Sequence, residues 1–138
     1  MTTWEITAFK YAERNARTRK DSFIFDDDHA APHAMDYYVW LLEADGRRIL
    51  VDTGYDHAEA ASRDRPIETP PEQMLAQRGI DANSIETVIL THLHYDHAGS
   101  LKAFPNARLC VQETEMANAT GPCMSHDTLR MPFTGYHV

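Results

Sequence analysis

The chain has little of what membrane-spanning and disulfide-stabilised proteins need. Its 138 residues contain no apolar run long enough to cross a bilayer, and the first six residues lack the basic and apolar blocks of a signal peptide. Only two cysteines are present, Cys110 and Cys123, which are too few for a disulfide framework and lack the spacing of a thiolate zinc site. From these absences we expect a cytoplasmic protein with no membrane partner.

Positive charge is also scarce. The formal net charge is −8, and the run Asp26–Asp28 adds a local cluster of carboxylates. Most of this surface would repel a phosphate backbone, so we expect no nucleic-acid partner. With 43% hydrophobic and 25% charged residues, the composition is that of an ordinary globular protein. No repeat or linker divides the chain, and residues 1–138 are predicted to form a single domain.

Dense β-forming runs predict the strands. Tyr37–Leu42 and Arg48–Val51 flank the pair Asp45-Gly46, and such a pair between two β-forming runs is a strong hairpin signal. The run Ala107–Val111 is predicted to be a buried strand with Cys110 inside the core. Further strands are expected at Trp4–Phe9, Ser22–Phe25 and Thr87–Leu90.

Helices are expected mainly in the second half of the chain. The segment Thr69–Gly79 begins with two prolines, which the first helical turn tolerates, and ends at a glycine. Ser100–Phe104 and Gln112–Ala119 are also predicted to be helical, whereas His57–Arg65 fits either a loop or a helical turn. A β-rich start followed by strand–helix units predicts an α/β (α+β) fold, a mixed sheet with helices on one face.

One stretch, Thr91–Gly99, concentrates the chemistry of the chain. It carries His92, His94, Asp96 and His97, spaced His-x-His-x-Asp-His, directly after a predicted strand. On extended backbone the first two imidazoles point to the same side, and a turn into helix lets the adjacent Asp and His aim at a neighbouring point. The pattern therefore predicts two divalent metal ions, zinc first, with iron, manganese or cobalt as alternatives. A histidine-rich surface loop is the simpler alternative.

This stretch resembles the signature of the metallo-β-lactamase superfamily, and it is most similar to the N-acyl-homoserine lactonase branch. Carried over by position, the resemblance implies that His92 and His94 bind one metal and that Asp96 and His97 bind the second. It also implies an αββα sandwich of two halves, of which this chain would hold only the first βα half.

A second match lies upstream, in the segment Ile49–Tyr55, whose Asp-Thr-Gly resembles the end of a strand in that superfamily. The resemblance implies that Asp52 supports the metal ligands from behind, by orienting a metal-bound imidazole. The alternative is that Asp52 is a turn residue that caps the following segment.

The resemblance implies a metal-dependent hydrolase that opens a lactone ring. Two metals would lower the pKa of a water molecule to give the attacking hydroxide, and Asp96 would bind metal and could also relay a proton to the leaving alkoxide. The substrate would then be a small lactone. Two alternatives remain: a hydrolase of another lactone, an ester or a thioester, and a truncated, inactive half-domain that binds metal.

The predicted ligand set is incomplete, because two metals need about three protein ligands each and the motif supplies four. The superfamily draws another His, a bridging Asp and a last His from positions expected beyond Val138; His126 and His137 do not match them. Half of a sandwich would also leave the apolar inner face of its sheet uncovered. We therefore expect a partial domain that associates with its missing half or with a second copy as a homodimer.

Overall fold

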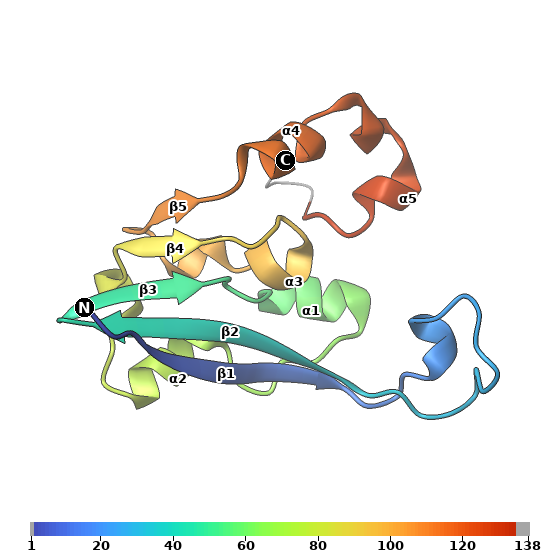
Figure 1. Cartoon of the computed structure of the whole chain (residues 1–138), viewed down its shortest axis with the longest axis horizontal. Coiled ribbons are helices and arrows are strands. Elements are labelled where there is room, and N and C mark those ends of the chain that lie inside the picture. Colours follow the sequence, from blue (N-terminus) through green and yellow to red (C-terminus); the bar gives the residue numbers. More distant parts are fainter. Residues whose placement is uncertain (1, 135–138) are drawn as a thin grey trace.

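The centre of the molecule is a five-stranded mixed sheet whose strands lie side by side in chain order (Figure 1). The computed structural model describes residues 2–134. The strands are β1 (Glu5–Arg14), β2 (Met35–Ala44), β3 (Arg47–Val51), β4 (Thr87–Ile89) and β5 (Arg108–Cys110). The α-helices are α1 (His57–Arg63), α2 (Pro71–Gln77), α3 (Tyr95–Ala98), α4 (Glu113–Ala119) and α5 (Asp127–Arg130). Short 3-10 turns lie at Arg19–Asp21, Ala82–Ser84, Leu101–Ala103 and Pro122–Ser125.

The sheet changes direction at β3. Strand β2 runs antiparallel to both β1 and β3, whereas β3, β4 and β5 run parallel to one another. Asp45 and Gly46 form the predicted hairpin turn with φ of 51° and 74°, a conformation that Asp and Gly adopt more readily than bulkier residues. The parallel step from β3 to β4 is made by α1 and α2, and it brings the carboxyl ends of both strands to the same edge.

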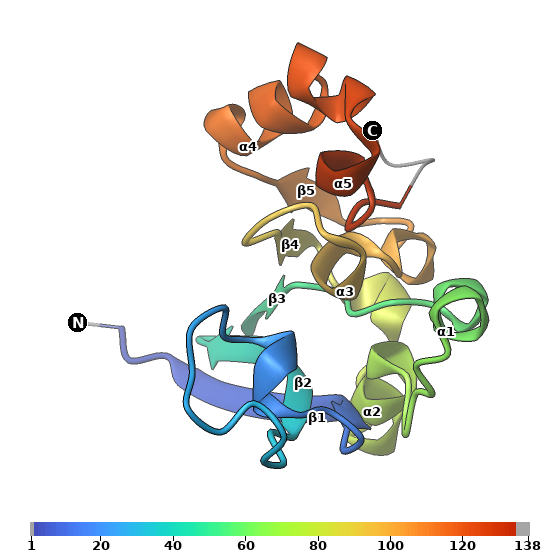
Figure 2. The same ribbon diagram turned by 90° about the vertical axis from the view of Figure 1, so that its right-hand side faces the viewer.

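Helices α1, α2 and α3 lie on one face of the sheet, as Figure 2 shows from the end. The side chains of β2 alternate accordingly, with Tyr37, Val39 and Leu41 buried and their neighbours more exposed. The predicted mixed sheet with helices on one face is therefore confirmed. The core beneath the helices includes Tyr11, Leu50, Tyr55, Leu75, Ile85, Val88 and Phe104.

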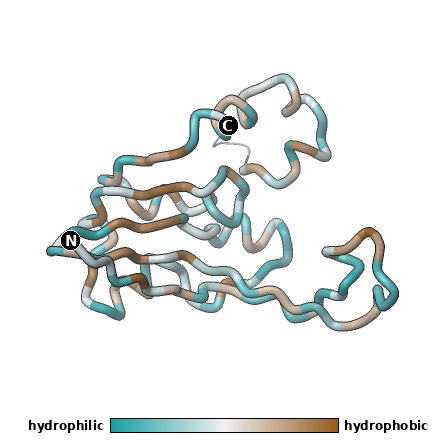
Figure 3. The backbone as a smooth tube through the Cα atoms, viewed as in Figure 1, coloured by the Kyte–Doolittle hydropathy of each residue, from teal (hydrophilic) through white to brown (hydrophobic). Residues whose placement is uncertain are grey.

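The other face of the sheet is uncovered within residues 2–134. It presents Ile6 and Ile89, which are 63% and 38% exposed, with Trp40 half-buried between them. Figure 3 shows the hydrophobic residues that run along the strands. The expected apolar sheet face is therefore present, and it is a surface that soluble monomers usually bury.

Two expectations about strands were wrong. Ser22–Phe25 is not a strand: it lies in the long connection between β1 and β2, which projects beyond the sheet (Figure 1). A turn forms there because Asp21 bonds back to Thr18 and Arg19 pairs with Asp26, and the segment has no partner strand. The tip of this connection leaves Ile24 and Phe25 85% and 95% exposed.

The segment Ala107–Val111 does contain a strand, β5, but that strand is not buried. Leu109 is 44% exposed and Cys110 is half-buried, because β5 is the last strand of the sheet and has a neighbour on one side only. The open choice at His57–Arg65 is resolved as helix α1, capped by the side chain of Asp56. No helix within residues 2–134 is long and apolar enough to span a membrane.

Truncating a side chain should lower the free energy of unfolding more on the covered face of the sheet than on the uncovered face. Leu50→Ala should lower the free energy of unfolding by about 3 kcal/mol, because the fully buried side chain leaves a cavity under the helices. Ile89→Ala, on the uncovered face, should cost about 1 kcal/mol or less. Urea unfolding of both variants measures this difference, and equal losses would show that the Ile89 face is covered in solution.

Candidate metal centre

The predicted donors lie where the parallel strands β3 and β4 end. Asp52 follows β3 directly, and the chain after β4 carries Thr91–Gly99 across the same edge of the sheet. The backbone N–H of Asp52 donates to the carbonyl oxygen of Ile89 at 2.8 Å, which ties the two strand ends together. The carboxyl ends of parallel strands are the usual place for sites in open α/β sheets.

The three imidazoles of the motif form one cluster. His92 lies between the other two, with ring centroids 4.5 Å from His94 and 4.0 Å from His97. His94 is the last extended residue before α3, so it stays beside His92, while the single turn of α3 carries Asp96 and His97. The structure therefore brings all four predicted donors into one region at the edge of the sheet.

Asp52 lies behind this cluster and is completely buried. One carboxylate oxygen accepts the backbone N–H of Thr91 at 2.8 Å, and the other lies 2.8 Å from Nδ1 of His97. The hydroxyl of Thr91 donates to the same carboxylate at 2.8 Å. Asp52 has a φ of 63°, a left-handed conformation that Asp tolerates, and this turn directs its carboxylate back under the motif.

Nε2 of His97, the other ring nitrogen, faces a carboxylate oxygen of Asp96 at 3.5 Å. Zinc–nitrogen and zinc–oxygen bonds of about 2.0–2.2 Å would span that separation at an angle close to tetrahedral. Because Asp52 accepts from Nδ1, it leaves Nε2 as the nitrogen available to a metal. The pair Asp96–His97 therefore fits a divalent ion.

The carboxylates control the charge of His97. Burial by itself would lower the pKa of His97, but hydrogen bonds to Asp52 and Asp96 raise that pKa to about 9. Burial would raise the pKa of Asp96, yet its bond with His97 holds the pKa of that carboxyl below its usual range. Burial, together with the neighbouring imidazoles, lowers the pKa of His92. Without metal the site thus favours ionised Asp96, neutral His92 and protonated His97, so a metal ion at Nε2 of His97 would have to displace a proton.

Other histidines lie elsewhere. His29 is exposed and His33 packs against Phe23, both in the connection between β1 and β2. His126 is exposed at the start of α5, and His137 lies outside the described residues. Within residues 2–134, no three His, Cys, Asp or Glu side chains are arranged to hold one ion.

Several residues that surround the motif gave no signal in the sequence. The hydroxyl of Tyr11, in β1, donates to the carbonyl oxygen of Asp96 at 2.7 Å, and Glu115 accepts the backbone N–H of Leu93 at 2.9 Å. Phe133 pairs with His94 as an isolated β-bridge, and its ring stands edge-on to the imidazole with centroids 5.1 Å apart. These contacts join segments far apart in the chain, so local patterns cannot predict them.

Arg63 links α1 to the same region. Its guanidinium lies 4.0 Å from the ring centroid of Tyr95 and donates to the carbonyl oxygen of Met131 at 3.0 Å. The N–H of Tyr95 in turn donates to the carbonyl oxygen of Pro132 at 2.7 Å. The segment Met131–Phe133 is therefore held against the candidate metal motif by contacts to Arg63, Tyr95 and His94.

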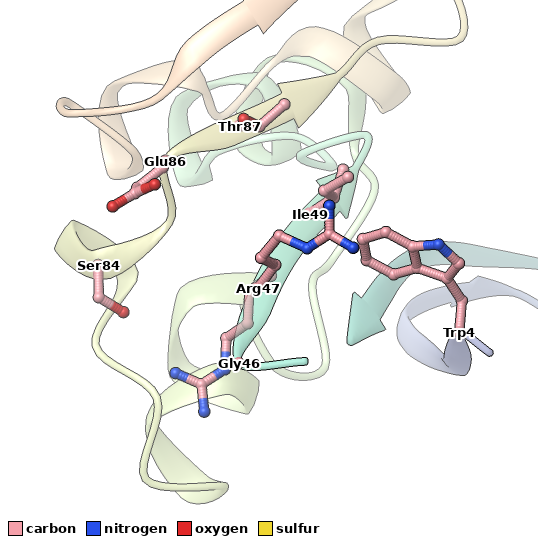
Figure 4. A pocket seen from close by; sticks show the side chains of 8 residues that line it. Trp4, Gly46, Arg47, Ile49, Ser84, Glu86 and Thr87 are labelled. Atoms are coloured by element: carbon pink, nitrogen blue, oxygen red, sulfur yellow. The ribbon is translucent and has the colours of Figure 1, made fainter. Parts of the chain in front are cut away.

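Two pockets differ in their chemistry. One borders the motif and is lined by Tyr11, Met35, Asp36, Tyr37, Tyr38, Trp40, Asp96 and His97. The other, shown in Figure 4, lies at the opposite ends of β3 and β4, beside Trp4, Arg47 and Thr87. None of the eight residues that line this second pocket is a histidine or a cysteine, so it offers no imidazole or thiolate for metal or nucleophile. Only the first pocket adjoins the candidate centre.

The fold and the motif define a class of protein. A family model described as the metallo-beta-lactamase superfamily matches residues 35–132. The chain therefore belongs to the metallo-beta-lactamase superfamily, as its Thr91–Gly99 and Ile49–Tyr55 segments indicated.

Among individual relatives, N-acyl homoserine lactonases recur. AiiB of Rhizobium rhizogenes is 45% identical over 96 residues, which cover 59% of this chain and 34% of the relative. AiiA of Bacillus thuringiensis subsp. kurstaki is 30% identical over 92 residues, which cover 56% of this chain and 37% of the relative. The chain is thus related to N-acyl homoserine lactonases, and it spans about a third of the length of these relatives.

Solved structures show the same fold. A quorum-quenching N-acyl homoserine lactone hydrolase matches with a TM-score of 0.66 and 22% identity, covering 96% of this chain and 55% of that one. AidC, a dizinc quorum-quenching lactonase solved with a homoserine product, matches with a TM-score of 0.61 and 19% identity, covering 88% of this chain and 47% of that one. The sheet and helices therefore correspond to about half of these lactonase structures.

The contact between Asp52 and His97 predicts a change in titration. In the metal-free chain, Asp52→Asn should lower the pKa of His97 from about 9 toward its ordinary value, because the amide carries no charge. Asn tolerates the left-handed conformation, so the backbone need not move. NMR titration of the His97 ring in the presence of a chelator measures this pKa.

The raised pKa of His97 makes the stability of the folded chain depend on pH. Because the pKa of His97 is raised in the folded chain, its contribution to stability is present below the ordinary pKa and is lost as the pH rises through about 9. Asp52→Asn should remove most of that pH dependence. Asp45→Asn, an exposed carboxylate in the hairpin turn, is the matched control. An unchanged His97 pKa in Asp52→Asn would show that the Asp52 carboxylate is not what raises it.

Proposed function

We propose that the cluster is a two-metal centre in which His92 and His94 bind one ion and Asp96 and His97 bind the second. Three observations support this ligand set. The ring of His92 lies within 4.5 Å of the rings of His94 and His97, and the spacing of Asp96 and His97 fits a shared ion. The buried carboxylate of Asp52 holds Nδ1 of His97. Zinc is the first candidate, because imidazole and carboxylate donors suit it and a related lactonase is described as dizinc.

We further propose that the protein hydrolyses a lactone, with N-acyl homoserine lactones as the leading substrate class. The observation that carries this proposal is the intact set of four donors at the sheet edge, in a chain related to N-acyl homoserine lactonases. Because the chain spans only part of those relatives, the proposal concerns the activity of the whole protein.

The residues of this chain would each have a defined task. A bound pair of divalent ions supplies Lewis acidity and lowers the pKa of water, which is the chemistry that ester-bond hydrolysis needs. Asp52 holds His97 with Nε2 toward Asp96. Asp96, held below its usual pKa, stays ionised near neutral pH and available as a donor. Relaying a proton to the leaving alcohol would be a second task for the same carboxylate.

The pocket that borders Asp96 and His97 has walls suited to an apolar substituent. Tyr38 and Trp40 line it from the uncovered face of the sheet, and Asp36 adds a second carboxylate to that of Asp96. An acyl group beside such aromatic walls would be partly removed from water. This pocket supports an uncharged, partly apolar substrate, and it is compatible with a lactone, an ester or a thioester.

Metal binding tests the proposed centre. The purified protein should retain zinc after gel filtration, and His94→Ala and His97→Ala should each weaken zinc affinity at least about tenfold, because each removes a donor. Elemental analysis and zinc titration give the amount and the affinity. His29→Ala, an exposed histidine outside the cluster, is the matched control and should bind as the wild type does.

An equal loss of zinc affinity in His29→Ala would show that the motif is not a metal centre, and a wild-type chain without zinc would show that these four donors do not form one by themselves. The number of zinc ions bound per chain distinguishes a completed two-metal centre from a half-domain that binds metal weakly. Near two zinc ions per chain would mean that other donors complete the site, whereas weak binding of a single ion would favour the half-domain alternative.

A substrate panel tests the proposed reaction. The protein should open N-acyl homoserine lactones, detected as proton release, and a chelator should abolish the activity. Asp96→Asn should lower kcat/KM at least about a hundredfold, whether the carboxylate binds metal or also carries a proton. Turnover of aryl esters or thioesters with none of the lactones would overturn the lactonase proposal while leaving a metal-dependent hydrolase.

A further inference from the structure

Helix α3 is too short to be stable by itself, although it carries both Asp96 and His97. It has four residues, one turn, and an isolated turn of helix costs more conformational entropy than its single round of hydrogen bonds returns. The last carbonyl groups of any helix also lack partners inside the helix. What fixes the two side chains must therefore lie outside α3.

The segment after β3 supplies one of those missing partners. The backbone N–H of Thr53 donates to the carbonyl oxygen of His97 at 2.7 Å. The N–H of Gly99, just after α3, donates to the carbonyl oxygen of Gly54 at 2.8 Å and ties the end of the helix to the same segment. The carbonyl oxygen of Asp96 is reached instead by a side chain, the hydroxyl of Tyr11, at 2.7 Å. This contact joins positions 85 residues apart and comes from the other side of the core.

A β-bulge points Tyr11 inward. The pairing of β1 with β2 skips one residue between Lys10 and Ala12, so Tyr11 and Ala12 are both fully buried although they are adjacent. The carbonyl oxygen of Tyr11 accepts the backbone N–H of Glu68 at 2.9 Å, which holds the bulge on its outer side. Bulges of this kind redirect a side chain, and they are common beside functional sites.

The ring of Tyr11 is held as firmly as its backbone. It packs edge-on against the ring of Tyr55 with centroids 5.2 Å apart, and a Cβ added to Gly54 would lie 3.1 Å from it. The hydroxyl of a tyrosine is protonated at neutral pH, so it is available as a donor. A rigid donor is therefore aimed at the carbonyl group of Asp96.

We propose that Tyr11 is a positioning residue for the metal centre: its hydroxyl fixes α3 and thereby the pair Asp96–His97. This inference rests on the proposed function, because it assigns those two side chains as metal ligands. Tyr11 also lines the pocket beside the centre, but its positioning role needs no contact with the metal. It acts through the backbone of α3. Its loss should therefore weaken the metal bound by Asp96 and His97 more than the metal bound by His92 and His94.

The same core offers matched controls. Tyr37 and Tyr55 are also buried, 5% and 1% exposed, and both rings pack against Tyr11. Within residues 2–134 their hydroxyl groups have no hydrogen-bond partner, unlike that of Tyr11. Each Tyr→Phe change removes one oxygen atom from the same aromatic cluster, and only Tyr11→Phe removes a bond to α3.

The experiment compares Tyr11→Phe, Tyr37→Phe and Tyr55→Phe in two measurements. The first is amide hydrogen exchange of the metal-free protein at His97 and Ala98, whose N–H groups bond to the carbonyl oxygen of His94. Tyr11→Phe should speed this exchange about tenfold relative to the rest of the sheet, the scale of one lost hydrogen bond. The second is cobalt(II) titration, in which Tyr11→Phe should weaken one of the two ions about tenfold and shift its visible spectrum, while the controls match the wild type.

Three results would overturn the inference: Tyr11→Phe behaving like Tyr37→Phe, exchange that rises uniformly over the whole sheet, or an equal loss at both metals. If the wild-type protein binds no cobalt, the proposed function fails on its own, and the exchange at α3 still decides whether Tyr11 positions that helix. Faster exchange confined to α3 supports the positioning role, and unchanged exchange rejects it.

Discussion

The buried carboxylate of Asp52 is the interaction on which the candidate centre depends. A fully buried charge is unfavourable unless it is paired, and here it accepts hydrogen bonds from Thr91 and His97 while its own N–H bonds to Ile89. One side chain therefore joins the ends of β3 and β4 to α3. The candidate metal motif Thr91–Gly99 continues the chain from β4 and is tied to the end of β3 by Asp52.

The sheet that positions the centre also leaves one face unprotected. Helices α1, α2 and α3 cover the face that carries Val39, Leu41 and Leu50, whereas Ile6 and Ile89 remain exposed on the other. Since the chain corresponds to about half of the lactonase structures it resembles, the open face and the incomplete donor set occur together. The pocket beside Asp96 and His97 includes Trp40 from that open face, so whatever covers the sheet would also shape the proposed substrate pocket.

Sequence patterns predicted structure correctly where it depends on adjacent residues, and wrongly where it depends on segments that pair or pack only in the folded chain. The turn at Asp45-Gly46 was predictable because few residue pairs accept its positive φ angles. Ser22–Phe25 has the composition of a strand but no strand to pair with, so capping by Thr18 and Asp21 decides its structure instead. The burial of β5 was overestimated, because a run of apolar residues does not show that its strand lies at an edge.

The sequence by itself determined which candidate metal donors are present, their spacing, and the strands and turn that present them. The family was also readable from two short segments, because metal ligands must be particular residue types at fixed intervals. Only the tertiary structure decided how those donors are held. Tyr11, Arg63 and Phe133 contact the motif across long separations in the chain, and no local periodicity records such contacts, since any residue of similar size and polarity could make them once the core has packed.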